Sequence, residues 1–262
     1  MSHTVLEAEA SAVRTKGLAL GYAGEPVVEH VDLEVAPGEI VVVLGHSGCG
    51  KSTLLRAIAG LLTPLKGEVV AGGRCVRGPD ADRALVFQDD ALLPWRTARK
   101  NVELPLAIQG VGRRERRRVA AQWLDRVGLS RHADRLPGQL SGGMRQRVQL
   151  ARALAGAPGV ICMDEPFGAL DAQTRRSMQE LLIEAWQASG CTVVFVTHDV
   201  DEALLLADRI VVLGRHGVVA EHSVEHPRDP ARAEGAAVRA EILAALSLTQ
   251  SLAPVEHRKV PA

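Results

Sequence analysis

A glycine-rich loop between an apolar run and a helix constrains this chain more than any other feature. Residues 45–52 read Gly-His-Ser-Gly-Cys-Gly-Lys-Ser, which matches the pattern G-x-x-x-x-G-K-[S/T]. The loop follows the apolar, β-branched run 40–44 and precedes apolar residues at helical spacing. Its glycines allow successive backbone N–H groups to converge on phosphate oxygens, and the helix start adds the positive end of its dipole. The sequence therefore predicts a phosphate-binding loop at the end of a strand.

The last two residues of this loop have predicted roles. Lys51 is expected to reach the β- and γ-phosphates of a nucleotide, and the Ser52 hydroxyl to ligate Mg²⁺. Cys49 lies near the helix start, where a thiol can become reactive, but we interpret it as a small loop residue. The alternative for the whole segment is a glycine-rich strand-to-helix turn that binds nothing.

The chain is predicted to fold as an α/β protein with a mostly parallel sheet at its core. Runs that are apolar on both faces are typical of parallel strands buried between helices. The expected strands are 40–44, 84–87, 160–163, 192–196 and 210–213. The expected helices between them include 51–61 and 171–188. Strands that alternate with helices in this way indicate an α/β domain.

Three regions depart from this alternation. Residues 96–155 contain no convincing strand and are rich in arginine, so we expect a helical subdomain inserted between two strands. Residues 18–35 read as short alternating strands that would form an antiparallel β edge. The last part of the chain has one helical patch at 236–248, and its end, 253–262, is expected to be flexible.

Composition argues against several functions. Lys and Arg together number 31, as do Asp and Glu, and only 3% of residues are aromatic, so the basic excess and ring content of a general nucleic-acid binder are missing. The arginine-rich run 113–118 is interpreted as a solvated helix face rather than as a site for an anionic partner.

The four cysteines form no CxxC pair, which favours a reducing cytosol. We expect neither a signal peptide nor a membrane span, because the longest uncharged stretch, 185–197, is too short.

Two carboxylates end the strand predicted at 160–163. Parallel strands bring their carboxyl ends to the edge where phosphate loops lie, so Asp164 is expected to hold Mg²⁺ and Glu165 to polarise a water for attack on the γ-phosphate. His198 follows the next strand and is expected to contact the γ-phosphate. The alternatives are an ordinary acidic strand end and an ordinary loop histidine.

The segment 140–148 predicts a second anion site. Ser141 is a good helix N-cap, and Gly142 and Gly143 would occupy the first turn, where glycine is costly unless the backbone must approach something closely. A serine hydroxyl and N–H groups at a helix start bind phosphate well. The alternative is a capped helix with a glycine pair. Since one nucleotide does not need both phosphate sites in one fold, we expect two copies arranged head to tail, each capping the ATP of the other.

Taken together, these motifs resemble the ATP-binding subunits of ABC transporters over about residues 18–213. The resemblance is carried by the phosphate loop, Gln88, the signature at 140–147, Asp164 and Glu165, the turn at 168–171, and His198. It implies a P-loop NTPase fold of the ABC ATPase type. It also implies an ATP-binding domain at 13–222, with its helical subdomain at about 96–155, and a C-terminal extension at 223–262.

The resemblance also implies roles for individual residues, with ATP and Mg²⁺ as the bound groups. Catalysis would involve Glu165, His198 and Gln88. Mg²⁺ would be held by Ser52, Gln88 and Asp164. The nucleotide would be bound by Tyr22, stacked on adenine, and by Gly45, His46, Ser47, Gly48, Cys49, Gly50, Lys51, Ser52, Thr53, Ser141, Gly142, Gly143 and Asp171. His46 replaces a proline and Met144 a glutamine that are common in the family, and neither departure is expected to prevent nucleotide binding.

The partners implied by the resemblance are a second copy of the chain and an integral membrane permease, on which the helical subdomain would dock. A solute-binding protein outside the cell would take part indirectly. The chain would then lie peripherally on the cytoplasmic face of the inner membrane, where ATP hydrolysis drives import. The alternative from another class is a soluble ABC-type factor that acts on nucleic acid or ribosomes. Such factors usually carry two of these domains, whereas this chain has one.

The segment 78–95 is similar to the branch of importers for taurine, aliphatic sulfonates and nitrate. Within this branch the taurine subunits are most similar, and taurine is therefore the expected cargo, with an aliphatic sulfonate or nitrate as alternatives. Four residues after Gln88 would form an apolar knob for a permease groove: Leu92, Leu93, Pro94 and Trp95. The alternative is a small satellite core beneath a loop.

Overall fold

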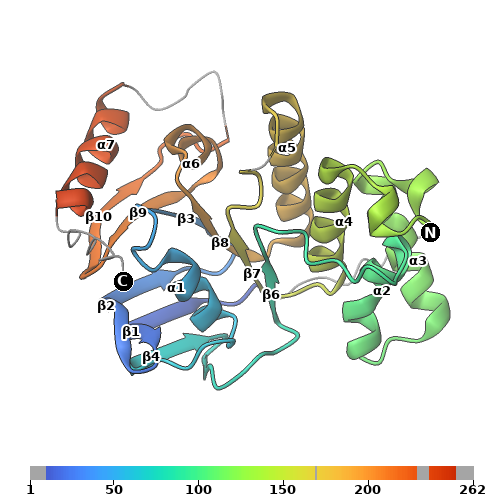
Figure 1. The fold of residues 1–262 in the computed structure, drawn as a ribbon, viewed down its shortest axis with the longest axis horizontal. Helices are drawn as coiled ribbons and strands as arrows, with labels where there is room; N and C mark the ends of the chain where they lie inside the picture. Colours follow the sequence, from blue (N-terminus) through green and yellow to red (C-terminus); the bar gives the residue numbers. More distant parts are fainter. Residues whose placement is uncertain (1–9, 169, 229–235, 252–262) are drawn as a thin grey trace, which may run out of the picture.

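The computed structural model describes residues 10–168, 170–228 and 236–251, and its core is a six-stranded sheet (Figure 1). The strand order is β10-β9-β3-β8-β7-β6, and all neighbouring pairs are parallel except β9 and β10. The strands are β3 (Ile40–Leu44), β6 (Arg83–Val86), β7 (Val160–Asp164), β8 (Thr192–Thr197), β9 (Arg209–Gly214) and β10 (Gly217–Ser223). The α/β prediction with a mostly parallel core is confirmed.

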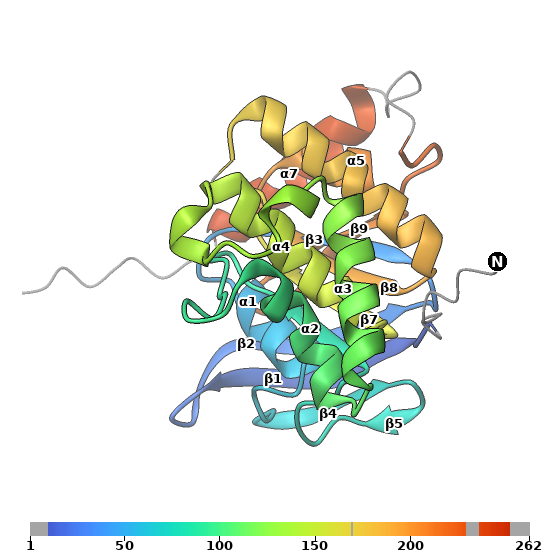
Figure 2. The same ribbon diagram turned by 90° about the vertical axis from the view of Figure 1, so that its right-hand side faces the viewer.

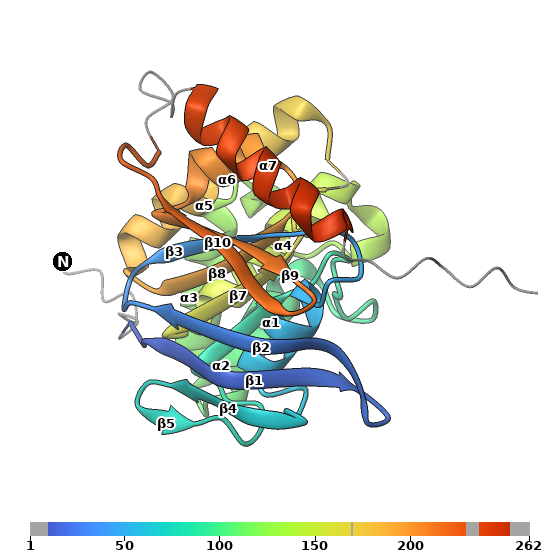
Figure 3. The same ribbon diagram turned by 90° about the vertical axis from the view of Figure 1, so that its left-hand side faces the viewer.

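A second sheet, which is fully antiparallel, packs against one face of the first, and Figure 3 shows its strands one below another. Its order is β2-β1-β4-β5. The strands are β1 (Val13–Tyr22), β2 (Glu25–Val35), β4 (Lys66–Ala71) and β5 (Arg74–Cys75). The antiparallel region predicted at 18–35 is therefore present, but it consists of two long strands of a separate sheet, which starts before residue 18.

Strand alternation divides the interior into two cores. Side chains of Ile40 and Val42 pack on one side of the sheet, and those of Val41 and Val43 on the other. The first core is covered by the helices α2 (Ala98–Ile108), α3 (Arg113–Arg126), α4 (Gly142–Ala155), α5 (Ala172–Ser189), α6 (Val200–Leu206) and α7 (Ala236–Ser251). The second core lies between the two sheets and contains the helix α1 (Lys51–Ile58). Burial on both faces explains why these strands are apolar throughout.

The helical region predicted between 96 and 155 forms the helices α2, α3 and α4, which lie together at one end of the molecule in Figure 1 and face the viewer in Figure 2. Two short 3-10 turns, Ser130–His132 and Pro137–Gln139, connect α3 to α4. The helix patch predicted at 236–248 is α7, whereas the predicted flexible end, 253–262, lies outside the described residues. Among the described helices, none is both long enough and apolar enough to cross a bilayer.

Candidate functional site

The glycine-rich loop joins β3 to α1, as predicted. Gly48 and Gly50 have φ of 80° and 105°, a conformation that residues with a side chain adopt rarely. A Cβ on Gly50 would also lie 2.8 Å from the Val28 side chain. The loop therefore needs glycine for its curl and for its packing against β2. This curl is the backbone shape in which N–H groups converge on an anion.

Lys51 lies buried at the start of α1, with its ammonium group against the loop. Its Nζ donates hydrogen bonds to the carbonyl oxygens of Gly45 at 2.7 Å and His46 at 3.0 Å. Thr53, on the same turn, is also buried. Burial raises the pKa of the Cys49 thiol, which keeps it protonated and supports its interpretation as a small loop residue.

The end of β7 brings the first predicted carboxylate to the phosphate loop. The Ser52 hydroxyl donates to Asp164 Oδ1 at 2.9 Å. Partial burial raises the pKa of Asp164, the Ser52 hydrogen bond opposes this shift, and the charge of Glu165 adds to it. A hydroxyl and a carboxylate at this separation are hard oxygen ligands, which Mg²⁺ prefers. The pair therefore fits Mg²⁺.

Glu165 has an unusual backbone conformation, with φ of 42°. Its N–H donates to the Val196 carbonyl at 3.0 Å, and its own carbonyl accepts from the Gly168 N–H at 3.2 Å. Such a conformation costs about 1–3 kcal/mol for a residue with a side chain, and it is typical of functional sites. The sequence carried no signal for this strain.

His198 follows β8 and faces Glu165, with His198 Nδ1 3.2 Å from Glu165 Oε2. The His198 side chain is 68% exposed, compared with 23% for Glu165. Gln88 emerges at the same edge, because β6 pairs with β7 and Val86 lies opposite Met163. The structure thus places Asp164 against the phosphate loop and His198 against Glu165, while Gln88 lines the pocket at the start of α4.

The raised pKa of Asp164 leads to a prediction about stability. A carboxyl with a raised pKa binds its proton more tightly in the folded than in the unfolded chain, so its charge lowers stability at pH 7. Asp164→Asn is therefore expected to raise the melting temperature of the Mg²⁺-free protein at pH 7. This gain should shrink as the pH falls toward about 4, the ordinary pKa of aspartate. The same variant should lose the effect of Mg²⁺ on ATP binding.

Melting curves from pH 4 to 8 and ATP titrations with and without Mg²⁺ measure both effects. Asp125→Asn, on the exposed end of α3, shows what the same change does away from the site. A lower melting temperature at pH 7 for Asp164→Asn, or an unchanged response to Mg²⁺, would contradict the prediction.

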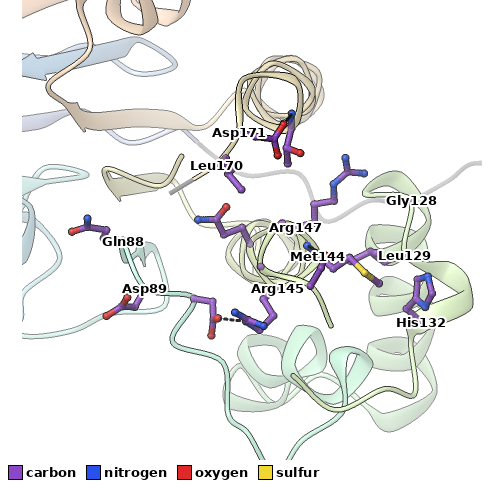
Figure 4. Close-up of a pocket in the computed structure, with 16 residues that line it drawn as sticks. Gln88, Asp89, Gly128, Leu129, His132, Met144, Arg145, Arg147, Leu170 and Asp171 are labelled. Carbon is purple, nitrogen blue, oxygen red and sulfur yellow. Dashed lines mark hydrogen bonds and ion pairs between the residues drawn. The ribbon is translucent and has the colours of Figure 1, made fainter. Parts of the chain in front are cut away.

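The predicted second anion site lies at the start of α4, in a pocket of about 580 Å³ (Figure 4). Ser141 is the N-cap, and its Oγ accepts from the Met144 N–H at 3.3 Å. A Cβ on Gly143 would lie 3.1 Å from Thr174 on α5, so a side chain there would crowd the α4–α5 contact. The pocket is lined by Gln88, Asp89, Asp90, Gly128, Leu129, His132, residues 141–147, Leu170, Asp171 and Thr174.

Two acidic residues shape the pocket wall. Asp90 accepts from Arg145 Nε at 2.6 Å, which ties the segment after β6 to α4. Asp171 caps α5, with Oδ1 accepting from the N–H groups of Gln173 at 3.1 Å and Thr174 at 3.0 Å. These hydrogen bonds lower the pKa of Asp171. Ala169, within the predicted 168–171 turn, lies outside the described residues.

The helices that follow the two anion sites pack on opposite faces of the main sheet. The helix α1, which follows the phosphate loop, packs in the core between the two sheets, whereas α4 packs in the other core. Figure 1 shows β6 and β7 between these helices. No residue of 45–53 lines the pocket at Ser141. This separation agrees with the prediction that the second site serves another copy.

The structure also shows where Tyr22 and the predicted apolar knob lie. Tyr22 is 46% exposed at the end of β1, and its hydroxyl accepts from Arg56 of α1 at 2.8 Å, so it lies beside the helix of the phosphate loop. The predicted apolar knob is reduced, because Leu92 is buried in the main core. Trp95 is 74% exposed. Leu92 therefore belongs to neither an exposed knob nor a separate satellite core.

Comparisons with known proteins agree with this arrangement. A family model described as ABC transporter matches residues 28–168. The chain is 51% identical over 208 residues to a taurine import ATP-binding protein of Chromobacterium violaceum, covering 79% of this chain and 78% of that protein. It is 48% identical over 220 residues to an uncharacterized ABC transporter ATP-binding protein of Methanocaldococcus jannaschii, covering 82% of each.

A solved structure is similar as well. It is the dimeric post-hydrolysis state of an ATP-binding cassette bound to ADP and phosphate, and it matches with a TM-score of 0.73 and 36% identity. The match covers 82% of this chain and 99% of that one.

Proposed function

The chain belongs to the ABC transporter family as an ATP-hydrolysing subunit coupled to transport, and from this premise we propose that it powers the import of taurine. Two copies would bind two ATP molecules between them and act on an integral membrane permease at the cytoplasmic face of the inner membrane. A solute-binding protein would deliver the cargo. The observation that supports the two-copy arrangement is that one chain carries two separate candidate anion sites, since no residue of the phosphate loop lines the pocket at Ser141.

The proposed domain division is the one expected from the sequence. Residues 13–222 form the ATP-binding domain, with residues 96–155 as its helical subdomain, and 223–262 form the C-terminal extension. The exposed Trp95, next to the helical subdomain, is the proposed contact with the permease. Aromatic side chains that are exposed in the free protein are frequent anchors of such interfaces.

The proposed chemistry divides between the two halves of a shared pocket. The phosphate loop and Lys51 bind the phosphates, and Tyr22 packs on adenine. Ser52, Asp164 and Gln88 would hold Mg²⁺, which neutralises charge on the phosphates. Glu165 would orient and polarise the attacking water, while His198 senses the γ-phosphate. Residues 141–143 of the second copy would complete the pocket, with Asp171 at the seam between the copies.

The first test is the role of Lys51. Lys51→Ala is expected to weaken ATP binding by about 10- to 100-fold, since a charge-assisted hydrogen bond in such a site contributes about 1.5–3 kcal/mol. Titration of the purified protein with a fluorescent ATP analogue measures the change. Lys100→Ala, on an exposed position of α2, is the matched control and should bind as the unchanged protein does. Equal affinity of the two variants would contradict the assignment of the site.

The cargo needs a separate test in cells. The similarity to taurine import proteins supports taurine, and the alternatives are an aliphatic sulfonate or nitrate. A strain that lacks this gene should lose uptake of labelled taurine and regain it with the unchanged gene, but not with Lys51→Ala. Uptake of an alkanesulfonate and of nitrate is measured in parallel. Loss of one of these in place of taurine would assign the cargo to that branch.

A further inference from the structure

The helix α7 reaches the phosphate loop from the far end of the chain. His46 Nε2 lies 2.7 Å from the carbonyl oxygen of Leu246, and the two residues are 200 positions apart. A carbonyl oxygen can only accept, so Nε2 carries the proton in this contact. Figure 3 shows α7 lying across β9 and β10, at the edge of the main sheet. The loop that is expected to bind phosphates is therefore tied to the C-terminal extension.

The position of α7 is determined by packing as well as by this bond. Ile242 is fully buried and Ala245 nearly so, and both belong to the main core. Thr249 of α7 lies beside Gly214 at the end of β9, where a Cβ would be in van der Waals contact with the Thr249 side chain at 3.5 Å. An ion pair between Arg239 of α7 and Asp201 of α6 adds an exposed contact. The helix is thus docked along one buried face.

His46 links this docked helix to the lysine of the phosphate loop. Its side chain is bonded to α7, while its backbone carbonyl accepts from Lys51 Nζ at 3.0 Å. A displacement of α7 would therefore release the side chain of His46 and loosen the carbonyl that holds the Lys51 ammonium group. Because Lys51 is buried, it has few other positions to occupy. The contact with α7 consequently acts on the residue that is expected to bind the phosphates.

We propose that α7 is a positioning helix for the phosphate loop, and that its docking and nucleotide binding are thermodynamically linked through His46. This inference rests on the proposed function, because it assumes that the loop binds ATP. With α7 docked, Leu246 holds His46 and the loop in the binding conformation. By reciprocity, bound nucleotide stabilises the docked helix to the same degree. A ligand or partner that displaces α7 would lower the affinity for ATP from outside the nucleotide site.

The test displaces α7 in the full-length chain. Ile242→Asp places a charge in the main core, and Arg239→Glu sets a like charge against Asp201 without touching the core. Ile242→Asp is expected to bind Mg-ATP about 5- to 100-fold more weakly, the usual range of coupling between sites. Arg239→Glu changes only an exposed pair and is expected to weaken binding in the same direction, by at most about 5-fold. Leu248→Asp is the matched control, because Leu248 is 62% exposed on the same helix. It should leave the affinity unchanged.

Hydrogen exchange distinguishes linkage from a purely structural role of α7, because a helix that is not linked to the site would exchange at the same rate with and without nucleotide. Amides of α7 in the unchanged protein should exchange more slowly when Mg-ATP is bound. In the His46→Ala background, Arg239→Glu should have little further effect on affinity, since the linking residue is already gone. Additive losses from the two changes would overturn the role of His46.

The outcomes also separate this inference from the proposed function. A variant whose α7 amides exchange faster but whose affinity for Mg-ATP is unchanged would overturn the linkage, although the loop would still be an ATP site. A failure of the unchanged protein to bind Mg-ATP would overturn the proposed function itself. Since Arg239 and Asp201 are exposed partners, Arg239→Glu keeps the test valid even if Ile242→Asp does not fold.

Discussion

Glu165→Gln is expected to lower the steady-state rate of ATP hydrolysis by about 100- to 10,000-fold, the contribution usual for a general base. The amide is nearly the same size as the carboxylate but cannot accept a proton from the attacking water. Nucleotide binding should persist, because the phosphate loop and the Ser52–Asp164 pair are untouched. Phosphate release from the purified protein, with ATP binding titrated in parallel, measures the separation of the two effects.

The control for this variant is Glu180→Gln, the same change on the exposed face of α5, where Glu180 pairs with Arg176. Its hydrolysis should match that of the unchanged protein. A hydrolysis rate of Glu165→Gln within a few-fold of normal would assign the base elsewhere. In that case the contact between His198 and Glu165 would be structural, and the strained backbone at Glu165 would need another explanation.

The parts of the site that could be predicted from the sequence are those whose residues are adjacent along the chain. The phosphate loop needs glycines at fixed positions beside a lysine, and the strand before it is apolar because it is buried on both faces. Asp164 ends β7 and Glu165 follows it directly, so the parallel sheet brings them to its carboxyl edge, where the loop lies. In each case a local pattern and a general rule of sheet topology were sufficient.

Other features depend on contacts that no local pattern encodes. The strand β4 begins Lys-Gly-Glu, which is polar and contains a glycine at φ of 75°, so it does not resemble a strand in isolation. The bond between His46 and Leu246 joins distant residues of ordinary type. The sequence leaves open whether Leu92 is part of an exposed knob or of a small separate core, and the structure places it in the main core. Such details are decided by tertiary packing.

Ser141→Arg is expected to lower the rate of ATP hydrolysis by about 100-fold or more without weakening ATP binding to the phosphate loop. A guanidinium group in the pocket at the start of α4 would occupy the place proposed for the γ-phosphate of the other copy's ATP. Ser141→Ala is the informative companion, because it removes only the N-cap, which usually costs about 0.5–2 kcal/mol of stability. If Ser141→Arg hydrolyses ATP normally, the second site is not part of the reaction.

Mixing variants decides whether each pocket is shared between copies. In a mixed dimer of Lys51→Ala with Ser141→Arg, one pocket combines an intact Lys51 with an intact Ser141, so hydrolysis should return although each variant alone is inactive. A mixed dimer of the unchanged chain with the double variant should be inactive, because each of its pockets has one damaged half. A pocket built within a single chain predicts the reverse of both results. Since α1 and α4 lie in different cores of one chain, we expect recovery only in the first mixture.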